Sequence, residues 1–457
     1  MGSDWKTFTL EELASEQKSA LATGLFGSAI SSKFFQENGI PVIRGGNLSA
    51  NTSDRMSDDG LVFVSEEKAA EFKRSVVRKG DLIFTCWGTI NQVGLLDEQR
   101  QFDEYIISNK QMKVTLDVDK ADPLFVYYMF SGPKKQKEIL QNGIGAAVPG
   151  FNLGQLREHK LTLPNINNQR RIASYLDSLD QKITLNNQIN QTLEQMAQTL
   201  FKSWFVDFDP VKAKMNAEQP EWMDAPFLSK EVASLFPEKL VESELGLIPE
   251  GWKVGTLNDI AEFQNGYAFK GKDWTDEGFP VVKIGSVKPG IVDLKSCSYV
   301  AKPTIEPLER FKLSVGDILV GMTGYVGETG LVPHSTVAPY LNQRVGRLTP
   351  LNQNLYELLY VTVRNAAYKQ FAEAQAQGSA QANVSGKALM SYPIVIPSED
   401  TVVKFSELIA PMIKQKLAFS AQSEMLAQTR DTLLPKLLSG EIDLESVQVE
   451  AEKAITE

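Results

Sequence analysis

The sequence is poor in the residues on which many metal and catalytic sites depend. Its 457 residues include two cysteines, Cys86 and Cys297, and two histidines, His159 and His334. Two isolated cysteines cannot form a CxxC zinc-ligand pair, and such sparse use of cysteine fits a reducing cytoplasm. Neither histidine has an acid or base partner beside it in the sequence. We therefore expect no metal site and no cofactor.

Long apolar runs are also missing. No stretch of about 18 apolar residues occurs, so the sequence predicts no transmembrane helix. The N-terminal stretch 1–17 has neither a basic start nor an apolar core, which argues against a signal peptide. With 42% hydrophobic and 23% charged residues the composition is that of a globular protein. Its length favours two or more domains.

The short motifs of common enzyme classes are absent. The chain contains no GxxxxGK phosphate loop and no usable HExxH, GxSxG or GxGxxG context. It also lacks the Asn-Pro-Pro-Tyr type of motif found in amino methyltransferases. Its carboxylates show no spacing that singles out a catalytic pair. The sequence thus predicts a binding protein and no catalytic residues.

The negative charge is concentrated in two segments. The net charge is −10, but residues 216–250 carry −6 and residues 438–457 carry −5, which leaves +1 for the rest of the chain. Local basic patches remain compatible with this balance, so the net charge does not exclude nucleic acid as a partner.

The main organising feature is an internal repeat. The stretch VRKGDLIFTCWGTINQVGLL (77–96) matches LSVGDILVGMTGYVGETGLV (313–332), and NGIPVIRGGNL (38–48) matches EGFPVVKIGSV (277–287). SNKQMKV (108–114) and YLNQRVG (340–346) occupy equivalent places. Each copy ends in an apolar segment and a proline, Pro164 or Pro397, followed by a helical pattern. One long repeat indicates a duplicated module rather than a solenoid.

Within each module, short β-branched runs separated by Gly and Asn predict an α+β domain on a twisted sheet. Helical segments are expected at about 122–140 and 351–374. After each module comes a long helix with a heptad ladder of apolar residues, the pattern of a coiled coil. The predicted seam consists of Ile172, Leu176, Leu179, Ile183, Leu193, Leu200, Phe405, Ile409, Met412, Leu426, Leu433 and Leu437.

Two such helices can bury their apolar stripes on each other, most simply in antiparallel orientation. The first helix, from about 168 to 205, would be roughly 55 Å long. The alternative is that each helix packs only on its own domain. Asn186 and Asn190 interrupt the first stripe, where they either fix the register or meet solvent. Pro411 can kink the second helix.

Taken together, these parts resemble the specificity (S) subunit of type I restriction-modification systems. The resemblance is carried by LPNINNQRRIASYLDSLDQKI (163–183), LEQMAQTLFKSWFVDFDPVKAKM (193–215), ESELGLIPEGWKVGTLNDIAEFQNGYAFK (242–270) and LLPKLLSGEIDL (433–444). It covers almost the whole chain. The blocks IPVIRGGNLSA and SNKQMKV of the first module differ more from the sequences typical of the family than their counterparts in the second module do.

The resemblance implies a non-catalytic subunit with two target-recognition domains, each reading half of a split DNA sequence, related by an internal pseudo-twofold axis. It implies double-stranded DNA, two methyltransferase (modification) subunits and restriction subunits as partners. The expected parts are a first recognition domain at 1–164, a central helix at 165–215, an acidic connection at 216–248, a second recognition domain at 249–397, a distal helix at 398–440 and an acidic tail at 441–457.

DNA recognition needs Arg and Lys for phosphates and polar side chains for base edges, and both modules concentrate such groups near Gly-rich turns. Polar turns are common in any protein, so each single residue is a weaker prediction than the set. The candidates are Arg44, Asn47, Lys73, Arg74, Thr85, Trp87, Thr89, Asn91, Lys110 and Gln111 in the first module, and Lys270, Lys272, Lys283, Ser286, Thr323, Tyr325, Gln343, Arg344 and Arg347 in the second.

Two further features allow more than one interpretation. Phe201, Trp204, Phe205 and Phe208 form either a buried helix end or a docking patch, and the family resemblance favours docking. The small-residue loops 142–152 and 376–386 either lie against DNA or act as hinges. Competing hypotheses for the whole chain are a structural adaptor that binds protein or carbohydrate, and a self-contained restriction-modification enzyme, which the missing motifs disfavour.

Overall fold

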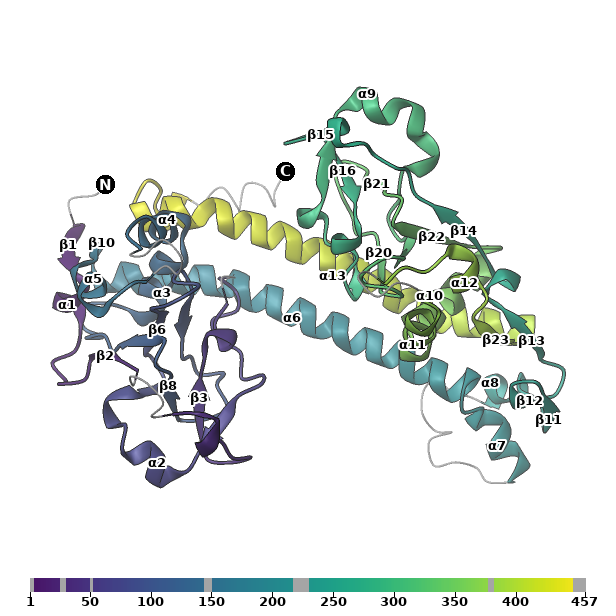
Figure 1. The fold of residues 1–457 in the computed structure, drawn as a ribbon, viewed down its shortest axis with the longest axis horizontal. Coiled ribbons are helices and arrows are strands. Elements are labelled where there is room, and N and C mark those ends of the chain that lie inside the picture. The colour runs from purple at the N-terminus through teal and green to yellow at the C-terminus, as the bar shows by residue number, and fades with distance from the viewer. Residues whose placement is uncertain are drawn as a thin grey trace. The chain divides into compact units, whose positions relative to one another are not determined.

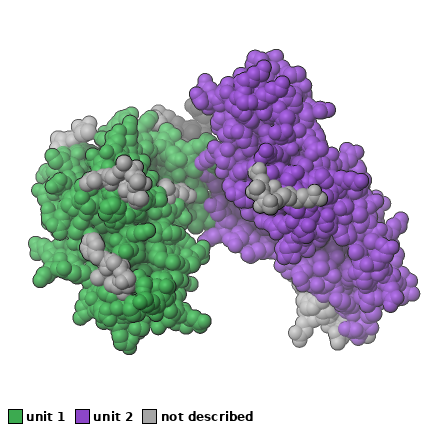
Figure 2. All heavy atoms as spheres, in the orientation of Figure 1, with its two compact units in different colours: residues 1–185, 424–457 green, residues 186–423 purple. Residues whose placement is uncertain are grey.

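A computed structural model of the chain describes residues 4–24, 30–49, 52–143, 150–216, 230–376 and 382–446. It divides into two compact units. Unit 1 comprises residues 1–185 and 424–457, and unit 2 comprises residues 186–423 (Figure 2). Each unit contains one copy of the repeat and a part of each long helix.

Unit 1 contains two four-stranded sheets and a separate strand pair. Its strands, α-helices and 3-10 helices (η) are β1 (Lys6–Thr9), α1 (Leu10–Leu13), β2 (Leu21–Thr23), η2 (Ser32–Phe34), β3 (Ile40–Ile43), η3 (Gly45–Asn47), β4 (Val62–Val64), α2 (Glu66–Ala70), η4 (Lys73–Ser75), β5 (Val76–Arg78), β6 (Leu82–Thr85), β7 (Val93–Leu95), β8 (Glu104–Ile107), β9 (Gln111–Val114), α3 (Pro123–Ser131), α4 (Pro133–Gln141), α5 (Leu153–Glu158) and β10 (Lys160–Leu163). The sheets have the strand orders β2-β9-β6-β7 and β4-β3-β8-β5. Strand β1 pairs with β10, and Figure 1 shows the two side by side.

Unit 2 has a five-stranded and a four-stranded sheet and two strand pairs. Its elements are α7 (Asp209–Met215), α8 (Lys230–Ser234), β11 (Leu240–Ser243), β12 (Gly246–Pro249), β13 (Lys253–Thr256), η6 (Leu257–Asp259), β14 (Ala261–Asn265), η7 (Gly271–Asp273), β15 (Trp274–Thr275), β16 (Phe279–Val282), η8 (Ile284–Ser286), β17 (Gly290–Ile291), η9 (Leu294–Ser296), β18 (Ser298–Val300), α9 (Lys302–Ile305), η10 (Glu306–Phe311), β19 (Ile318–Gly321), β20 (Thr329–Leu331), β21 (Tyr340–Leu341), β22 (Val345–Pro350), η11 (Gln353–Leu355), α10 (Tyr356–Arg364), α11 (Ala366–Gln375), α12 (Gly386–Met390) and β23 (Pro393–Ile396). The strand orders are β14-β22-β19-β20-β17 and β15-β18-β16-β21, with the pairs β13-β23 and β11-β12.

The two units repeat one topology. The order β2-β9-β6-β7 in unit 1 corresponds to β14-β22-β19-β20 in unit 2, and β4-β3-β8 corresponds to β18-β16-β21. The parallel pairing of β3 with β8 recurs between β16 and β21. The expected α+β class with two similar sheet-rich domains is therefore confirmed, and the sequence repeat is a repeat of fold.

Both shorter helical segments expected from the sequence are pairs of helices. The segment at 122–140 forms α3 and α4, because Pro133 cannot continue a helix and Gly132 ends α3. The segment at 351–374 forms α10 and α11, where the Asn365 side chain caps the start of α11.

Two unbroken helices follow the repeats, α6 (Ile166–Phe205) and α13 (Glu399–Ser439) (Figure 1). Asn165 caps α6 by accepting a hydrogen bond from the Asn168 amide at 3.0 Å. Helix α13 continues through Pro411, which is exposed.

The parts of α6 and α13 within each unit pack together in antiparallel register. In unit 1, Asp180 pairs with Arg430 at 2.6 Å, and in unit 2, Glu194 pairs with Lys416 at 2.6 Å. Asn186 donates to Gln422 at 2.9 Å across the same seam. The seam polar groups face each other, as a register-fixing role requires.

Most of the predicted seam contributes to the cores. Ile172, Leu176 and Ile183 of α6 are buried in unit 1, and Phe405 and Ile409 of α13 are buried in unit 2. Leu434 and Leu437 of α13 join the core of unit 1 next to Leu176. The remaining predicted seam residues are partly exposed: Leu179, Leu193, Leu200, Met412, Leu426 and Leu433.

Candidate nucleic-acid interface

The repeated topology brings four separate segments together at the ends of the sheet strands in each unit. We call them turn cluster 1 (residues 44–48, 86–92, 108–111 and 150–151) and turn cluster 2 (residues 283–287, 322–328, 342–345 and 382–384). In turn cluster 1, the Cys86 amide donates to the Lys110 carbonyl at 2.7 Å, and the Phe151 amide donates to the Cys86 carbonyl at 2.9 Å. These backbone hydrogen bonds therefore join residues that are far apart in the sequence into one surface.

Turn cluster 2 repeats these connections. The Met322 amide donates to the Arg344 carbonyl at 3.1 Å, and the Val384 amide donates to the Met322 carbonyl at 2.9 Å. The isolated bridges Trp87–Gly150 and Thr323–Asn383 are equivalent as well. The two clusters are thus the same construction made from different side chains.

A glycine allows the strand before each cluster to approach it closely. A Cβ atom on Gly24 would lie 1.8 Å from the Ser108 carbonyl oxygen, and one on Gly266 would lie 2.2 Å from the Asn342 carbonyl oxygen. Any other residue would push the chain away from the turn. The backbone at the clusters is therefore tightly fixed.

Several predicted DNA-contact residues are exposed on these clusters. Trp87 is 52% exposed and Tyr325 is 63% exposed, each on the turn that follows β6 or β19. The other candidates on the clusters that face solvent fully or in part are Arg44, Thr89, Asn91, Lys110, Lys283, Gln343 and Arg344. Four exposed candidates lie outside the clusters, on η4 and around η7: Lys73, Arg74, Lys270 and Lys272.

Among the described residues, Lys283 is the one of these cations whose contact with an aromatic ring is seen. Its ammonium lies 3.7 Å from the centroid of the Trp274 ring and 2.7 Å from the Ser298 hydroxyl. Arg44, the equivalent residue in turn cluster 1, donates to the Gly60 carbonyl at 2.8 Å. Both cations are held in place without a carboxylate partner in these contacts.

Six predicted contact residues have side chains that make contacts within their own unit, five of them buried and Arg347 partly exposed, and their contact with DNA stays a prediction. Asn47 donates to the carbonyls of Ser57 at 3.1 Å and Asp59 at 3.0 Å, and Thr323 donates to Asn383 at 2.7 Å. The six residues are Asn47, Thr85, Gln111, Ser286 and Thr323, which are buried, and Arg347, which is bound to Asp317 and Gln264.

The electrostatics of the clusters suit an anionic partner. Turn cluster 1 contains Arg44 and Lys110 and no Asp or Glu. Turn cluster 2 contains Lys283, Arg344 and one acidic residue, Glu328, which is 7% exposed and paired with Arg364 and Lys369. Exposed cations, amides and an aromatic ring without an exposed carboxylate are groups that bind phosphates and base edges.

The aromatic helix end does not form the exposed docking patch that the family resemblance favoured. Phe201, Trp204, Phe205 and Phe208 are at most 8% exposed and pack in the core of unit 2. The Phe205 ring lies 4.8 Å from that of Phe405. The structure thus supports the alternative, a buried helix end, because the aromatic rings find partners within the unit.

A groove nevertheless runs beside this helix end. It is a cavity of about 240 Å³ whose lining includes Phe201, Phe208, Val206 and Leu245. Val206 is 50% exposed and Leu245 is 43% exposed. The surface next to the buried aromatics is therefore apolar and partly open.

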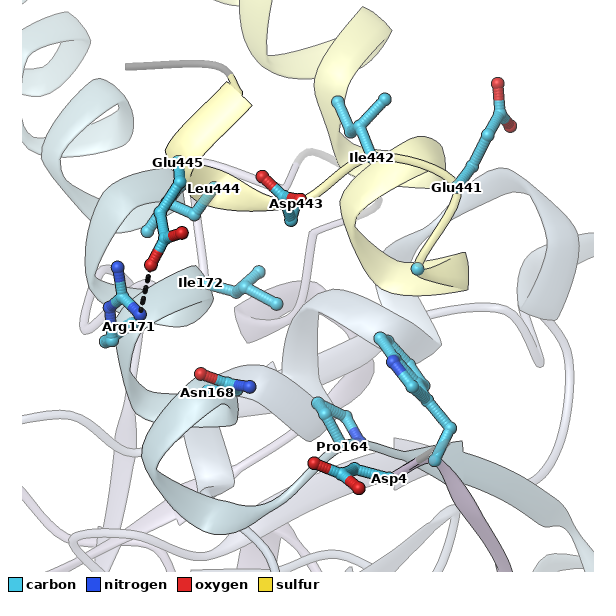
Figure 3. Close-up of a pocket in the computed structure, with 12 residues that line it drawn as sticks. Asp4, Pro164, Asn168, Arg171, Ile172, Glu441, Ile442, Asp443, Leu444 and Glu445 are labelled. Atoms are coloured by element: carbon cyan, nitrogen blue, oxygen red, sulfur yellow. Dashed lines mark ion pairs between the residues drawn. The ribbon is translucent and has the colours of Figure 1, made fainter. Parts of the chain in front are cut away.

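Unit 1 has a cavity of about 360 Å³ where the N-terminal strand meets residues 440–445 (Figure 3). Arg171 of α6 and Glu445 face each other across it, 3.7 Å apart. Leu444 is buried in the core of the unit. Residues 440–445 are thus part of the fold of unit 1.

Parts of four predicted segments lie outside the described residues: 144–149 and 377–381 of the two small-residue loops, 217–229 of the acidic connection, and 447–457 of the tail. In the described part of the chain, no group of three or more His, Cys, Asp or Glu side chains is placed to hold a metal ion. No described helix is long and apolar enough to cross a membrane.

One set of residues near the clusters was not found from the sequence. Glu194 of α6 binds Lys416 of α13 at 2.6 Å and Arg364 of α10 at 2.9 Å. Burial raises the pKa of Glu194, but the positive charges of Lys416 and Arg364 outweigh it and hold the pKa below its ordinary value. Burial lowers the pKa of Lys416, and Glu194 only partly offsets this. One sign of these ion pairs was visible in the sequence, because Lys416 stands at a position of the apolar seam of the second long helix.

Comparisons with known proteins agree with this arrangement. The family profile described as "Type I restriction modification DNA specificity domain" matches residues 2–195 and 249–423, one region for each repeat. The type I restriction enzyme HindI specificity subunit of Haemophilus influenzae is 24% identical over 96% of this chain and 100% of its own length. The MjaIX specificity subunit of Methanocaldococcus jannaschii is 21% identical over 84% of this chain and 82% of its own.

Among solved structures, the S subunit of a type I restriction-modification system from M. genitalium has a similar fold. The TM-score is 0.53 at 16% sequence identity, and the alignment covers 96% of this chain and 97% of the other. Each of the two regions matched by the family profile contains one copy of the duplicated fold and one turn cluster. The chain therefore belongs to the type I restriction-modification DNA specificity domain family.

Proposed function

We propose that this chain is the non-catalytic specificity subunit of a type I restriction-modification complex and reads a bipartite DNA target. Each unit reads one half-site through its turn cluster. The observation that carries the proposal is the recurrence, at equivalent positions, of two exposed clusters with the same backbone and different side chains. Two similar but non-identical readers suit a target made of two different half-sites.

Affinity and specificity come from different groups on each cluster. The cations Arg44 and Lys110 in unit 1, and Lys283 and Arg344 in unit 2, contact phosphates. The aromatic rings of Trp87 and Tyr325, together with the neighbouring amides, contact bases. Because each cluster offers few cations, binding by the chain alone is expected to be weak, and partner subunits add phosphate contacts.

The helices α6 and α13 set the spacing between half-sites and dock the partners. Half-sites on one face of a duplex recur every 34–36 Å or so, and a helix of 40 residues is about 60 Å long, which is long enough to span that distance. Two modification subunits bind the complex, one for each unit, and the restriction subunits join through it. The partly open groove beside Val206 and Leu245 is a candidate docking site in unit 2. The proposed place of action is the cytoplasm.

The test uses the chain in complex with its modification subunits. Binding to randomised duplexes should select one sequence with two fixed blocks separated by unspecified base pairs. Lys110→Ala and Arg344→Ala should each weaken binding by about tenfold at moderate salt and reduce its salt dependence. Lys137→Ala and Lys302→Ala remove an exposed lysine outside the clusters from each unit, and serve as matched controls.

A structural adaptor makes the opposite prediction. It would keep its binding activity after the cluster residues are changed and would show no preference among DNA sequences. Failure to select any sequence, with the modification subunits present, would contradict the proposed function. Methyl transfer by the isolated chain would contradict its non-catalytic character.

A further inference from the structure

Turn cluster 2 is joined to the helices by a buried acidic residue. Glu328 closes the turn that carries Tyr325, because its amide donates to the Tyr325 carbonyl at 3.2 Å and its carbonyl accepts from the Gly321 amide at 2.8 Å. Its side chain points away from solvent and is 7% exposed. The residue that shapes the turn therefore also connects it to the interior of the unit.

The carboxylate of Glu328 is held by two cations from neighbouring helices. Arg364, the last residue of α10, donates from its guanidinium at 3.2 Å, and Lys369 of α11 donates at 2.8 Å. The Arg364 guanidinium also donates to the Thr329 carbonyl, at 3.2 Å. Two helices thus hold Glu328 and Thr329, where the turn that carries Tyr325 ends.

Arg364 continues the connection to the long helices. Its Nε atom donates to Glu194 of α6 at 2.9 Å, and the other carboxylate oxygen of Glu194 accepts from Lys416 of α13 and from the Tyr360 hydroxyl, both at 2.6 Å. Lys416 is 6% exposed and Tyr360 is 1% exposed. One uninterrupted network of ion pairs therefore runs from both long helices to the exposed turn.

The packing around the turn leaves it little freedom. A Cβ atom on Gly327, whose φ is +74°, would lie 2.8 Å from the Ala372 Cβ atom on α11. The turn is pressed against α11 at the point where the ion pairs hold it. A small displacement of Arg364 must therefore be transmitted to the turn, because packed interiors do not absorb it.

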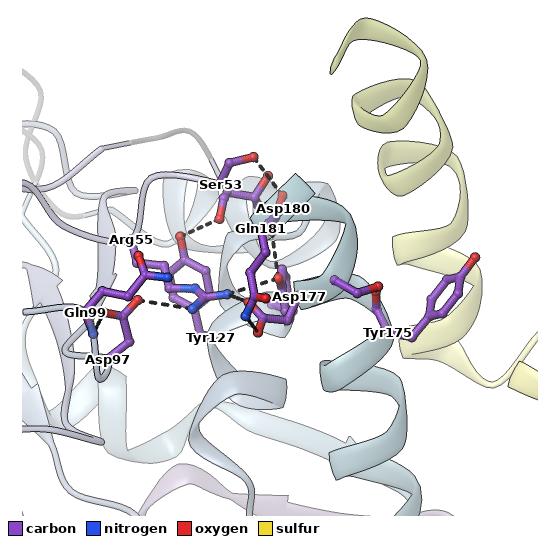
Figure 4. Close-up of polar contacts among 12 residues, drawn as sticks. Ser53, Arg55, Asp97, Gln99, Tyr127, Tyr175, Asp177, Asp180 and Gln181 are labelled. Carbon is purple, nitrogen blue, oxygen red and sulfur yellow. Dashed lines mark hydrogen bonds and ion pairs between the residues drawn. The ribbon is translucent and has the colours of Figure 1, made fainter. Parts of the chain in front are cut away.

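Unit 1 has a comparable connection made of different residues. Asp180 of α6 accepts from Arg430 of α13 at 2.6 Å, from the Tyr128 hydroxyl at 2.6 Å and from the Ser53 hydroxyl at 2.7 Å. Arg55 lies between Asp97 and Asp177 of α6 (Figure 4). Ser53 and Arg55 belong to the chain segment that follows residues 44–48 of turn cluster 1. This segment is tied back to the cluster by the Ser57 amide, which donates to the Asn47 carbonyl at 2.9 Å.

We propose that these networks position the reading turns, so that Glu328, Arg364 and Glu194 are specificity-determining positioning residues for the half-site read by unit 2. This inference rests on the proposed function. The residues do not touch DNA. They act by fixing the turn that carries Tyr325 against the parts of α6 and α13 that belong to unit 2.

The test compares variants of the full chain in complex with its modification subunits. Glu328→Gln removes the charge that holds the turn, and Arg364→Lys keeps a positive charge but loses the fork that joins Glu194 to Glu328. Each should reduce base discrimination about tenfold at one half-site and leave the other half-site unchanged. Tyr325→Ala identifies which half-site belongs to unit 2.

Two further variants make the outcome decisive. Lys369→Gln changes a side chain that is 46% exposed, so the fold tolerates it, and it should relax the same half-site to a smaller extent. Glu407→Gln removes a carboxylate from an exposed ion pair with Lys404 on α13, outside the network, and should change neither half-site.

Unchanged discrimination at both half-sites in Glu328→Gln and Arg364→Lys would overturn the inference. Equal relaxation of both half-sites would overturn it too, because that result indicates a general loss of structure. If either variant fails to fold, unchanged discrimination in Lys369→Gln overturns it. Absence of a bipartite target for the unaltered chain would instead be a failure of the proposed function itself.

Discussion

The exposed aromatic residues are the individual side chains on which base recognition most depends. Trp87 and Tyr325 project from equivalent turns and are more than half exposed. A contact that reads a base edge in duplex DNA contributes about 1–3 kcal/mol of discrimination. Trp87→Ala and Tyr325→Ala should therefore each weaken binding by about tenfold, measured by titration of the complex with its target duplex, and each should relax only one half-site. A change confined to overall affinity would show that the rings contact only the backbone.

The ion pairs of Glu194 predict how stability depends on pH. The pKa of Glu194 in the folded chain lies below its ordinary value of 4.5, so the folded state favours the charged form. This contribution is complete above about pH 4.5 and is lost as the pH falls through the folded pKa. Glu194→Gln should lower stability at pH 7 by about 3 kcal/mol, because Lys416 is left unpaired.

The variant should also lose part of the acid sensitivity. Thermal unfolding of both proteins between pH 7 and pH 3 measures this, with Glu407→Gln as the control from an exposed pair. A stability difference between Glu194→Gln and the unaltered chain that stays constant down to pH 3 would contradict the assigned charge state of Glu194.

For single residues, the sequence indicated which kinds of side chain stand on the turns better than it indicated which of them face solvent. Trp87, Tyr325, Lys110 and Arg344 were named as DNA contacts because Gly-rich turns present polar and aromatic side chains; the structure exposes all four, and their contact with DNA stays a prediction. Asn47 has the same chemistry and stands on a similar turn, yet it is buried against the Ser57 carbonyl. Whether a turn side chain faces inward depends on chain segments that pair with it from elsewhere, and a single sequence does not contain that information.

The paired helices carry a polar layer that lowers their stability. Asn186 is fully buried, and its carbonyl oxygen accepts no hydrogen bond within the described structure. Replacing Asn186 and its partner Gln422 together by leucine should stabilise unit 2 by about 1 kcal/mol and raise its unfolding temperature by a few degrees. Calorimetry of the double variant checks this. A lower unfolding temperature would show that the layer stabilises the pair as well as fixing its register.

The long helices were predicted closely because heptad periodicity persists over many turns. The expected start at about 168 and end at 205 compare with α6 at Ile166–Phe205. The shorter helices were predicted less well. The break between α3 and α4 follows from Gly132 and Pro133, whereas Pro411 in α13 breaks nothing. Proline ends a short helix readily, but tertiary packing on both sides can carry a long helix across it.

At the scale of the whole molecule, the helix pair predicts that spacer length and half-site identity are separable. Because α6 and α13 are paired, an insertion must be matched in both helices to keep their register. Seven residues added to each, after Gln188 and after Ala421, lengthen the pair by about 10 Å, or about three base pairs of DNA along its axis. The selected target should gain spacer without a change in either half-site. Altered half-site bases would contradict this division of labour.

The sequence repeat predicted a duplicated module with a helix after each copy, and the strand orders confirm that. It did not predict that the end of α13 and residues 440–445 complete the core of unit 1. Leu434, Leu437 and Leu444 pack there beside Leu176, some 260 residues earlier in the chain. Such long-range closure depends on which apolar stripes face each other, and periodicity alone does not specify the partner of a stripe.

Each unit is proposed to read one half of a split DNA target. This division of the target is tested most directly by exchanging residues 249–397 for the equivalent module of a relative and mapping the methylated positions in genomic DNA when modification subunits are present. One half-site should change to that of the donor, while the other half-site and the spacer should stay the same. A target that changes at both half-sites, or at neither, would contradict this division.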